Sequence, residues 1–329
     1  MKAIFLGTPD FAIPSLEALL NTSWIEVAAV CTQTDKEAGR GQKIQEPAIK
    51  KFAVQKNLRL FQCKKIKEDK ELIGKIKTLN PDILITCAFG QILSQEILNI
   101  APHGVLNVHA SLLPKYRGAA PINWAILNGE SETGITIMKT DIGIDSGPIL
   151  LQSVCKIEEA ETSIDLSKKL SLLGAKALIE ALSLVKEDNA KFILQDNLKA
   201  IKAPMLKKEL GLIDWNKSAL EIHNKIRGLQ PWPASYTHFR GQQIKLWESL
   251  FLGNTVSELS SEEHYLPCGS IVLISDRLVV KAGEGYLSIY KVQPENKKIL
   301  SAKDWINGAR IKTGEQFECI TSLQDNPKS

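Results

Sequence analysis

The sequence of 329 residues lacks the patterns that mark several common protein classes. Its six cysteines lie far apart with no Cys-x-x-Cys pair, which excludes a dense disulfide framework and indicates reduced, buried thiols. No apolar run reaches the 18 residues that a membrane-spanning helix needs. The apolar run that begins at Ala3 is too short for a signal peptide, so we expect a cytoplasmic protein with no membrane partner.

Motifs of several other chemistries are also missing. Gly7-Thr8-Pro9 stands where a dinucleotide-binding fold would carry Gly-x-Gly-x-x-Gly, and no Walker-type loop occurs, so a nicotinamide cofactor is not expected. There is no His-Glu-x-x-His motif and no Cys/His cluster, so we expect no metal. The net charge of +4 permits a polyanionic partner without requiring one.

The first half of the chain alternates predicted strands with predicted helices. Strands are predicted at residues 3–6, 25–31, 82–87, 105–109 and 135–139, and helices at residues 11–20 (with Asp10 as the N-cap), 46–56, 69–79 and 162–185. This rhythm predicts an α/β fold with a Rossmann-like, mostly parallel sheet and helices on both faces. We place this catalytic domain at residues 1–189.

The second half of the chain has a different pattern of charge and of predicted helices and strands. Residues 190–208 carry four lysines between positions 199 and 208 with no acidic residue among them, which indicates a basic linker. From residue 209 to 329 one helix is predicted at 218–227, followed by short strands at 235–239, 243–248, 269–275, 278–282 and 286–292. Short strands separated by turns predict a small antiparallel, OB-like barrel.

Two polar residues lie at the end of a predicted buried strand. Asn107 and His109 are two positions apart, so both point to one face near the strand's carboxyl end, where open α/β sheets bind ligands. Both side chains can donate hydrogen bonds to an oxygen that becomes negative. A satisfied polar pair is the alternative, but two polar groups before the turn that ends at Pro114 are costly to bury without a function.

A glycine-punctuated loop, residues 141–147, follows the predicted strand at 135–139. One of its two acids, Asp141 or Asp145, could face Asn107 and His109. A carboxylate there would orient His109 and keep it protonated, or accept the proton of an attacking amine. Two ordinary turn aspartates are the alternative interpretation.

The segment from Asn107 to Ile122, Asn-Val-His-Ala-Ser-Leu-Leu-Pro-Lys-Tyr-Arg-Gly-Ala-Ala-Pro-Ile, resembles the signature of the folate-dependent formyltransferases. Similar family motifs stand at residues 7–12, 134–138, 141–147, 213–215 and 230–233, in order along essentially the whole chain. The resemblance is strongest to the members that act on methionyl-tRNA. It implies an enzyme of translation initiation that transfers a formyl group from 10-formyltetrahydrofolate to the α-amino group of initiator methionyl-tRNA.

The resemblance also implies roles for particular residues. Asn107, His109 and Asp145 would be catalytic: the uncharged amine attacks the formyl carbon, Asn107 and protonated His109 stabilise the oxyanion, and Asp145 holds His109 charged. The implied folate-binding residues are Ser111, Leu112, Leu113 and Pro114 in one turn, and Phe89, Gly90, Gln91 and Leu93 along the pterin slot. A buried strand-to-helix turn would explain the second group equally well.

A long loop, residues 32–43, is rich in glycine and in charged residues and is the first candidate for tRNA binding. The resemblance implies that Arg40 wedges into the acceptor stem, and that Lys43, Lys207 and Lys208 contact phosphates, so binding weakens as salt rises. The sequence departs from the family at Met205, where a basic residue is common, and around Asp35. The family further implies a monomer.

Two other functions fit parts of this pattern. Another folate formyl enzyme, acting on a small amine or releasing formate, would share Asn107, His109 and Asp145. The loop of Arg40, the basic linker and the C-terminal barrel argue against it, although some sugar-nucleotide formyltransferases carry such a barrel. A non-catalytic RNA-binding protein on this scaffold would have lost the three catalytic residues, and all three are present.

Overall fold

The structure, a computed structural model, describes residues 1–38, 43–260 and 262–318. The described contacts divide the chain into two compact units. The first unit comprises residues 1–121, 132–156 and 166–204, and the second comprises residues 122–131, 157–165 and the chain from Met205 onward. The predicted linker is split by this division, because residues 190–204 belong to the first unit and residues 205–208 to the second.

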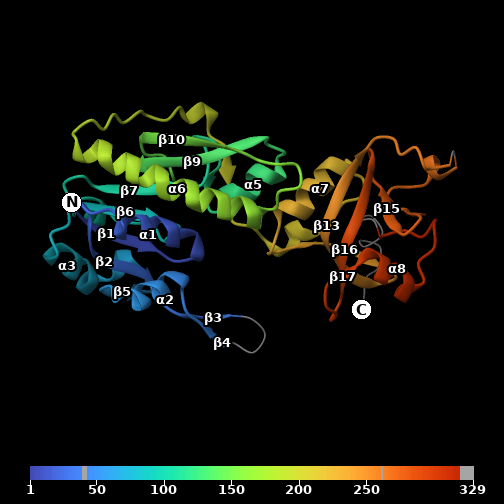
Figure 1. Ribbon diagram of the computed structural model, residues 1–329, viewed down its shortest axis with the longest axis horizontal. Helices are drawn as coiled ribbons and strands as arrows, with labels where there is room; N and C mark the ends of the chain where they lie inside the picture. The colour runs from blue at the N-terminus through green and yellow to red at the C-terminus, as the bar shows by residue number, and fades with distance from the viewer. Residues whose placement is uncertain (39–42, 261, 319–329) are drawn as a thin grey trace. The chain divides into compact units, whose positions relative to one another are not determined.

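A seven-stranded sheet forms the centre of the first unit (Figure 1). Its strands lie in the order β10 (Ile149–Lys156), β9 (Glu132–Lys139), β7 (Val105–His109), β6 (Ile83–Cys87), β1 (Lys2–Gly7), β2 (Glu26–Gln33) and β5 (Leu60–Cys63). The pairs from β7 through β5 are parallel, whereas β9 is antiparallel to both β7 and β10. The predicted mostly parallel sheet is therefore confirmed.

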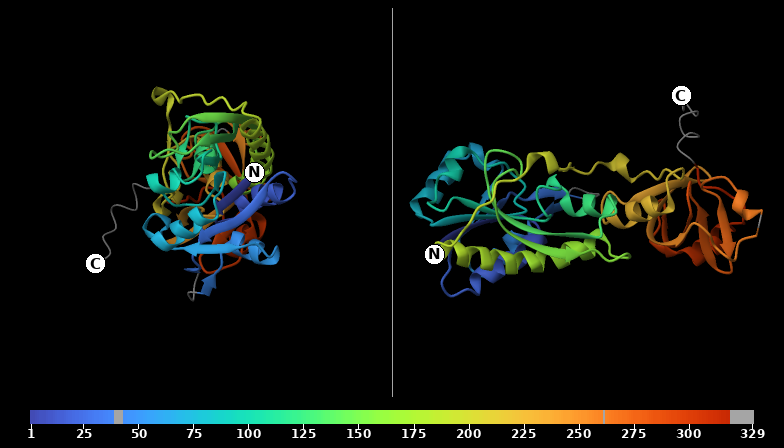
Figure 2. Two further views of the ribbon diagram at one scale, coloured as in Figure 1. Left: turned by 90° about the vertical axis from the view of Figure 1, so that its left-hand side faces the viewer. Right: turned by 90° about the horizontal axis from the view of Figure 1, so that it is seen from above.

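Helices cover both faces of this sheet, as predicted. They are α1 (Ile13–Leu20), α2 (Ala48–Gln55), α3 (Lys70–Thr78), α4 (Gln95–Leu98) and α6 (Ser163–Lys186), with 3-10 turns η1 (Asp10–Ala12), η2 (Ile66–Glu68) and η3 (Asn197–Lys199). Residues of α3 and α4 share one core with Ile4 and Leu84, whereas Gly174 of α6 packs against Val108 on the other face. Figure 2 shows α6 and α3 on opposite sides of the sheet.

Two details of the predicted elements were wrong. Asp10 is not an N-cap: η1 begins at Asp10 with Pro9 in the cap position, and the Asp10 carboxylate accepts from the neighbouring Phe11 N–H. Strands β5 and β10 were not predicted. Strand β10 is an outer strand of the sheet, and its polar Gln152 and Ser153 interrupt the apolar run that marks the inner strands.

Short pairings connect the loops of the first unit. Strands β3 (Lys36–Ala38) and β4 (Lys43–Gln45) form an antiparallel hairpin, and β8 (Arg117–Gly118) pairs in parallel with β11 (Lys202–Ala203). The second pairing requires glycine at position 118, since an added Cβ would lie 2.6 Å from the carbonyl oxygen of Ala203.

The second unit contains an antiparallel sheet in the order β12 (Ser235–Phe239), β13 (Gln242–Gly253), β16 (Tyr286–Pro294), β15 (Arg277–Lys281) and β14 (Ile271–Ile274), with β17 (Leu300–Ser301) paired to β16. It also holds α5 (Pro121–Leu127), α7 (Ala219–Gly228), α8 (Ala302–Ala309), η4 (Lys208–Gly211) and η5 (Glu263–Tyr265). The predicted antiparallel sheet is confirmed, and it is compatible with an OB-like fold. Among the described strands no hydrogen-bonded pairing joins β12 to β14, so backbone hydrogen bonds do not close the barrel.

A large apolar core lies inside the second unit. Trp215, Phe239, Trp305 and Phe317 meet there, with the rings of Trp215 and Phe317 stacked 5.2 Å apart. Ser218 and Glu221 form a capping box that starts α7, which explains why the predicted helix begins at this point. No helix in the part of the chain that the structure describes is long and apolar enough to span a membrane.

Candidate active site

Strand β7 carries Asn107 and His109 to one face of the sheet. Val105, two residues before Asn107, belongs to the apolar core on the side of α3, so the alternation of a strand places Asn107 and His109 on that side as well. His109 is the last residue of β7 and is only 6% exposed. The two polar side chains therefore stand at the carboxyl end of a central strand, as the spacing predicts.

The amide of Asn107 is fixed by the neighbouring strand. Thr86 on β6 is its register partner, and the Thr86 hydroxyl donates to Asn107 Oδ1 at 2.9 Å. Since the amide oxygen accepts this bond, the NH₂ group of Asn107 is the part of the side chain that can donate to a ligand.

The ring of His109 lies between a carbonyl and a carboxylate. Its Nε2 is 3.0 Å from the carbonyl oxygen of Tyr116, and because a carbonyl can only accept, Nε2 carries a hydrogen. Its Nδ1 is 3.6 Å from Asp145 Oδ2. The two ring nitrogens therefore face one carbonyl and one carboxylate, both of which are hydrogen-bond acceptors.

Asp145 reaches His109 from the loop that joins β9 to β10. Its Oδ2 accepts from the backbone N–H of Gly118 at 2.8 Å, which aims the carboxylate toward the end of β7. Asp145 itself has a φ of 51°, the left-handed conformation that non-glycine residues rarely adopt. The loop can turn so tightly because position 147 is glycine: an added Cβ would lie 1.9 Å from the carbonyl oxygen of Lys139.

The other acid of this loop has a structural role. Asp141 accepts from the backbone N–H of Gly143 at 3.1 Å and from the Ser146 hydroxyl at 3.0 Å. These are the bonds of an aspartate that shapes its own turn. The question that the sequence left open between Asp141 and Asp145 is therefore answered by geometry, because Asp145 faces His109.

The turn from Ser111 to Pro114 lies directly after β7. Ser111 is fully buried and its hydroxyl donates to the carbonyl of Lys115, while Leu113 is 4% exposed and its N–H donates to the Thr136 hydroxyl. Leu112 and Pro114 are half-buried, and the Leu113–Pro114 peptide is cis. The two buried residues of this turn shape the backbone around the site.

The segment from Phe89 to Leu93 lies at the carboxyl end of β6. Phe89 and Leu93 are buried, Gly90 has a φ of 72°, and the carbonyl of Phe89 accepts from Thr8 and from Gln33. The side chain of Gln91 is engaged elsewhere, since it accepts from the N–H of Ile66 and donates to the carbonyl of Cys63. Only the backbone of this segment and the exposed side chain of Ile92 are left to face a ligand.

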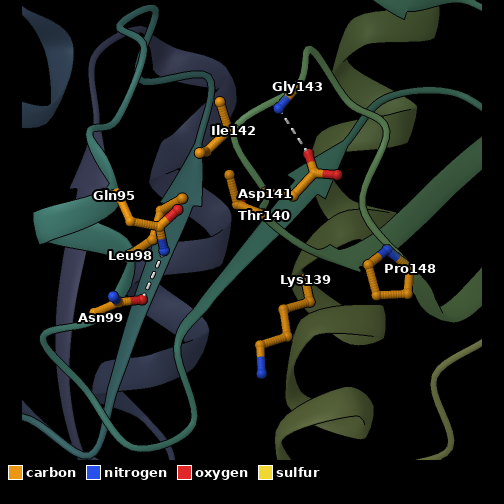
Figure 3. Close-up of a pocket in the computed structure, with 9 residues that line it drawn as sticks. All are labelled: Gln95, Leu98, Asn99, Lys139, Thr140, Asp141, Ile142, Gly143 and Pro148. Carbon is orange, nitrogen blue, oxygen red and sulfur yellow. Dashed lines mark hydrogen bonds between the residues drawn. The ribbon is translucent and has the colours of Figure 1, made fainter.

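A pocket opens beside the loop that carries Asp145 (Figure 3). It has a volume of about 460 Å³. Its walls combine the end of α4 with the start of the loop: Gln95, Leu98, Asn99, Lys139, Thr140, Asp141, Ile142, Gly143 and Pro148. Among the described residues the buried hydroxyl of Thr140 has no hydrogen-bond partner. The walls of the pocket combine apolar and polar side chains, as those of small-molecule sites do.

No described contact joins the predicted tRNA-binding residues to β7. Arg40 lies outside the described residues, and of Lys43 only the backbone, at the start of β4, is described. Lys207 and Lys208 are exposed at the beginning of the second unit, and η4 begins at Lys208.

The cysteines do not offer a nucleophile near this site. Cys31, Cys63 and Cys87 are buried, and burial raises the pKa of each thiol, that of Cys87 to about 12. Cys319 lies outside the described residues. Within the described ranges no group of three histidine, cysteine or acidic side chains is arranged to hold a metal ion.

Sequence reasoning missed several residues that shape the site. Thr86 orients Asn107 from a neighbouring strand, a contact visible only once β6 and β7 are paired. Arg117 was part of the quoted motif but had no assigned role, and it donates two hydrogen bonds to Gln195. Gln195 lies in the segment interpreted as a linker, where neither periodicity nor a motif indicated a function.

Comparison with known proteins gives matches over both units. A family model described as "Formyl transferase" matches residues 1–182, and one described as "Formyl transferase, C-terminal domain" matches residues 205–310. A curated relative from Acetivibrio thermocellus, named methionyl-tRNA formyltransferase, is 45% identical over 96% of this chain and 99% of its own length. A relative of the same name from Thermodesulfovibrio yellowstonii is 43% identical over 94% of this chain and 97% of its own length.

Solved structures share the fold at lower identity. A sugar 3N-formyl transferase crystallised with dTDP and 5-N-formyl-THF superposes with a TM-score of 0.65 at 21% identity, covering 91% of this chain and 99% of that one. An N-formyltransferase from Helicobacter canadensis, in complex with folinic acid and dTDP-3-aminofucose, gives a TM-score of 0.64 at 20% identity, covering 88% of this chain and 98% of that one.

Proposed function

The chain belongs to the formyl transferase family, and from this premise we propose that it transfers the formyl group of 10-formyltetrahydrofolate to the α-amino group of initiator methionyl-tRNA. The observation that carries the proposal is the 45% identity to a methionyl-tRNA formyltransferase across both units, 99% of that relative's length. The product, N-formylmethionyl-tRNA, would serve translation initiation.

Asn107 and His109 supply the electrostatic part of the proposed reaction. The uncharged amine attacks the formyl carbon, and the carbonyl oxygen becomes negative in the tetrahedral intermediate. The NH₂ group of Asn107, oriented by Thr86, is the donor for that oxygen, and the protonated ring of His109, held beside Asp145, stabilises its negative charge. One such donor lowers the barrier by roughly 2.7–4 kcal/mol.

We assign the proton transfer of this step to Asp145. The attacking nitrogen loses one proton, and N10 of the folate gains one as the bond between N10 and the formyl carbon breaks. Asp145 Oδ2 is held by the Gly118 N–H and faces His109, so Asp145 both stabilises the charged ring and is the base nearest to it. No net proton is consumed when the amine proton ends on N10.

The pocket beside the loop is the proposed place of the folate ring system. Leu98 and Ile142 offer apolar contact, whereas the amide of Asn99 offers hydrogen bonds to a heterocycle. The pocket shares its loop with Asp145, and a donor bound there would carry its formyl group near the end of β7. The predicted contacts from the turn at residues 111–114 remain part of this proposal.

For the tRNA we propose that Arg40, Lys43, Lys207 and Lys208 bind the acceptor stem. Lys207 and Lys208 are exposed, which is what phosphate contacts require. We further propose that the enzyme acts as a monomer in the cytoplasm, where aminoacylated initiator tRNA is available.

The test is formyl transfer from labelled 10-formyltetrahydrofolate to initiator methionyl-tRNA, with elongator methionyl-tRNA and free methionine as matched controls. We expect labelled product with the initiator and at least about tenfold less with either control, because one wrong contact costs roughly 1–3 kcal/mol. Transfer to amino-sugar nucleotides, the kind of acceptor seen with the structural neighbour from Helicobacter canadensis, but to no methionyl-tRNA would overturn the proposed acceptor.

A further inference from the structure

Residues 193–203, here called the strap, run from the loop of Asp145 to the turn after β7. At one end Ile193 and Ile149 exchange two backbone hydrogen bonds of 2.8 Å. At the other end the N–H of Arg117 donates to the carbonyl of Ile201 at 2.8 Å, and β11 pairs with β8. The strap therefore connects the start of β10, which follows the loop of Asp145, to β8, where the Gly118 N–H donates to the Asp145 carboxylate.

Gln195 is the strap residue whose side chain turns inward. It is half-buried, whereas the other residues from 191 to 199 are exposed. Its Nε2 donates to the carbonyl of Asp145 at 2.9 Å and to the carbonyl of Gly147 at 2.7 Å. One amide group thus holds the backbone of the catalytic loop on both sides of Ser146.

Arg117 fixes the direction of that amide. The Nε and Nη2 atoms of Arg117 donate to Gln195 Oε1 at 2.9 and 2.7 Å, and Nη2 also donates to Asn197 Oδ1 at 2.9 Å. Because a guanidinium can only donate, Oε1 must face Arg117 and the NH₂ group must face the loop. The hydrogen-bond pattern leaves Gln195 one orientation.

The loop needs such a restraint. Asp145 has a φ of 51°, a conformation that a non-glycine residue keeps only where its surroundings hold it. The carboxylate is held by the Gly118 N–H, but its backbone carbonyl is held by Gln195. Without Gln195 the loop could relax and move Oδ2 away from His109.

We infer that Gln195 is a positioning residue for Asp145, acting through the backbone of residues 145–147 with its own amide oriented by Arg117. Gln195 touches no reacting atom; it sets the distance between Asp145 and His109. The inference rests on the proposed function for its kinetic consequence, but the geometry has a readout of its own.

The first test is a double-mutant cycle on transfer kinetics with Gln195→Ala and Asp145→Ala. In the wild-type background Gln195→Ala should lower kcat about 10- to 100-fold, since a shift of about 1 Å at a catalytic group costs this much, with KM values changed less than threefold. In the Asp145→Ala background the same substitution should change kcat less than twofold. Equal losses in both backgrounds, or full activity of Gln195→Ala, would overturn the inference.

Two further variants separate the parts of the arrangement. Gln195→Glu still accepts from Arg117 but cannot donate to the two carbonyls, so it should be as impaired as Gln195→Ala. Activity rescued by Gln195→Glu would contradict the inference, because the bond to Arg117 would then suffice. Leu198→Ala, in the same strap with a side chain 97% exposed, is the matched control and should leave kcat unchanged.

A spectroscopic readout keeps the inference distinct from the proposed function. The Gly118 N–H donates to Asp145 Oδ2, so its amide proton resonance reports the carboxylate's position. Gln195→Ala should shift this resonance upfield, whereas Leu198→Ala should not. If the wild-type protein formylates no acceptor, the proposed function fails while this resonance still decides the inference; an unmoved Gly118 resonance in Gln195→Ala overturns it.

Discussion

His109 and His223 lie in different units, yet they are equally buried, at 6% exposure each. Both rings have polar partners at two nitrogens: the Tyr116 carbonyl and, at 3.6 Å, the Asp145 carboxylate for His109, and the Ser249 hydroxyl at 2.9 Å and the Glu159 carbonyl at 3.2 Å for His223. Burial and hydrogen bonding therefore do not distinguish a catalytic histidine from a structural one.

The difference lies in the charges around the two rings. His109 faces the carboxylate of Asp145 at the carboxyl end of β7. His223 lies inside the second unit, where burial lowers its pKa and the nearby Arg227 lowers it further, against the opposing effect of the Glu159 carbonyl. We therefore assign His223 to holding residues 157–165 against α7, in the neutral form.

The largest effect should come from His109→Ala. Loss of the charged donor should reduce kcat about 1,000-fold or more, while binding of methionyl-tRNA persists because the proposed phosphate contacts lie elsewhere. Steady-state formyl transfer and tRNA binding by filter retention measure the two quantities. If the variant keeps more than a tenth of the wild-type rate, His109 does not take part in the reaction.

Asp145→Asn should have the next largest effect. The amide keeps the size of the carboxylate and can still accept from Gly118, but it can neither stabilise a charged His109 nor take up a proton. We expect kcat to fall about 100-fold, the lower end of what acid–base groups contribute. The thermal unfolding midpoint serves as the control, and a rate within threefold of wild type would show that the carboxylate charge is not used.

His223→Ala should have the opposite effect from His109→Ala, because it should lower stability and leave the rate nearly unchanged. The substitution leaves the Ser249 hydroxyl and the Glu159 carbonyl without their partner, so the free energy of unfolding of the second unit should fall by about 2–3 kcal/mol. The kcat at permissive temperature should stay within about threefold of wild type. Denaturant titration followed by tryptophan fluorescence measures the loss, and an unchanged midpoint would contradict the structural assignment.

Acid should weaken the second unit through the same histidine. The folded state lowers the pKa of His223, so below about pH 6.5, the ordinary value for histidine, the unfolded chain binds a proton that the folded chain does not. The stabilisation is present above that pH and is lost as the pH falls toward the lower folded pKa. Between pH 7.5 and 5.5 the free energy of unfolding of His223→Gln should depend less on pH than that of the wild type. Equal pH dependence in the two proteins would contradict the role of His223 in acid destabilisation.

The smallest effect should come from Lys207→Ala and Lys208→Ala combined. Two lost phosphate contacts should raise KM for the tRNA about 3- to 10-fold and lower the salt slope of binding by one to two, with kcat unchanged. Lys217→Ala, an exposed lysine of the same unit that pairs with Glu221, is the control. An unchanged salt slope would show that these two lysines do not touch the tRNA.

Much of the first unit could be predicted from the sequence because its inner strands are continuous apolar runs. Strand β7 begins at Val105 and ends at His109 as predicted, and the alternation along it places Asn107 and His109 on one face. Strand β10 could not be predicted in the same way, since an outer strand mixes polar and apolar residues.

The supports of the site depend on contacts between distant segments. Thr86 and Asn107 meet only because β6 pairs with β7, and Gln195 reaches Asp145 across 50 positions of sequence. Neither residue has a local pattern that marks it. The sequence thus predicted which groups we propose for the chemistry, and the structure shows which residues contact two of these groups, Asn107 and Asp145.

The most direct test of the assigned chemistry is the single-turnover rate of formyl transfer by Asn107→Ala at saturating donor and methionyl-tRNA. Asn107 contacts Thr86 but has no charge, so its removal tests oxyanion stabilisation alone. We expect formyl transfer to be 100- to 1,000-fold slower, with unchanged dissociation constants for both substrates. A wild-type single-turnover rate in this variant would contradict the assigned chemistry and place the reaction away from the end of β7.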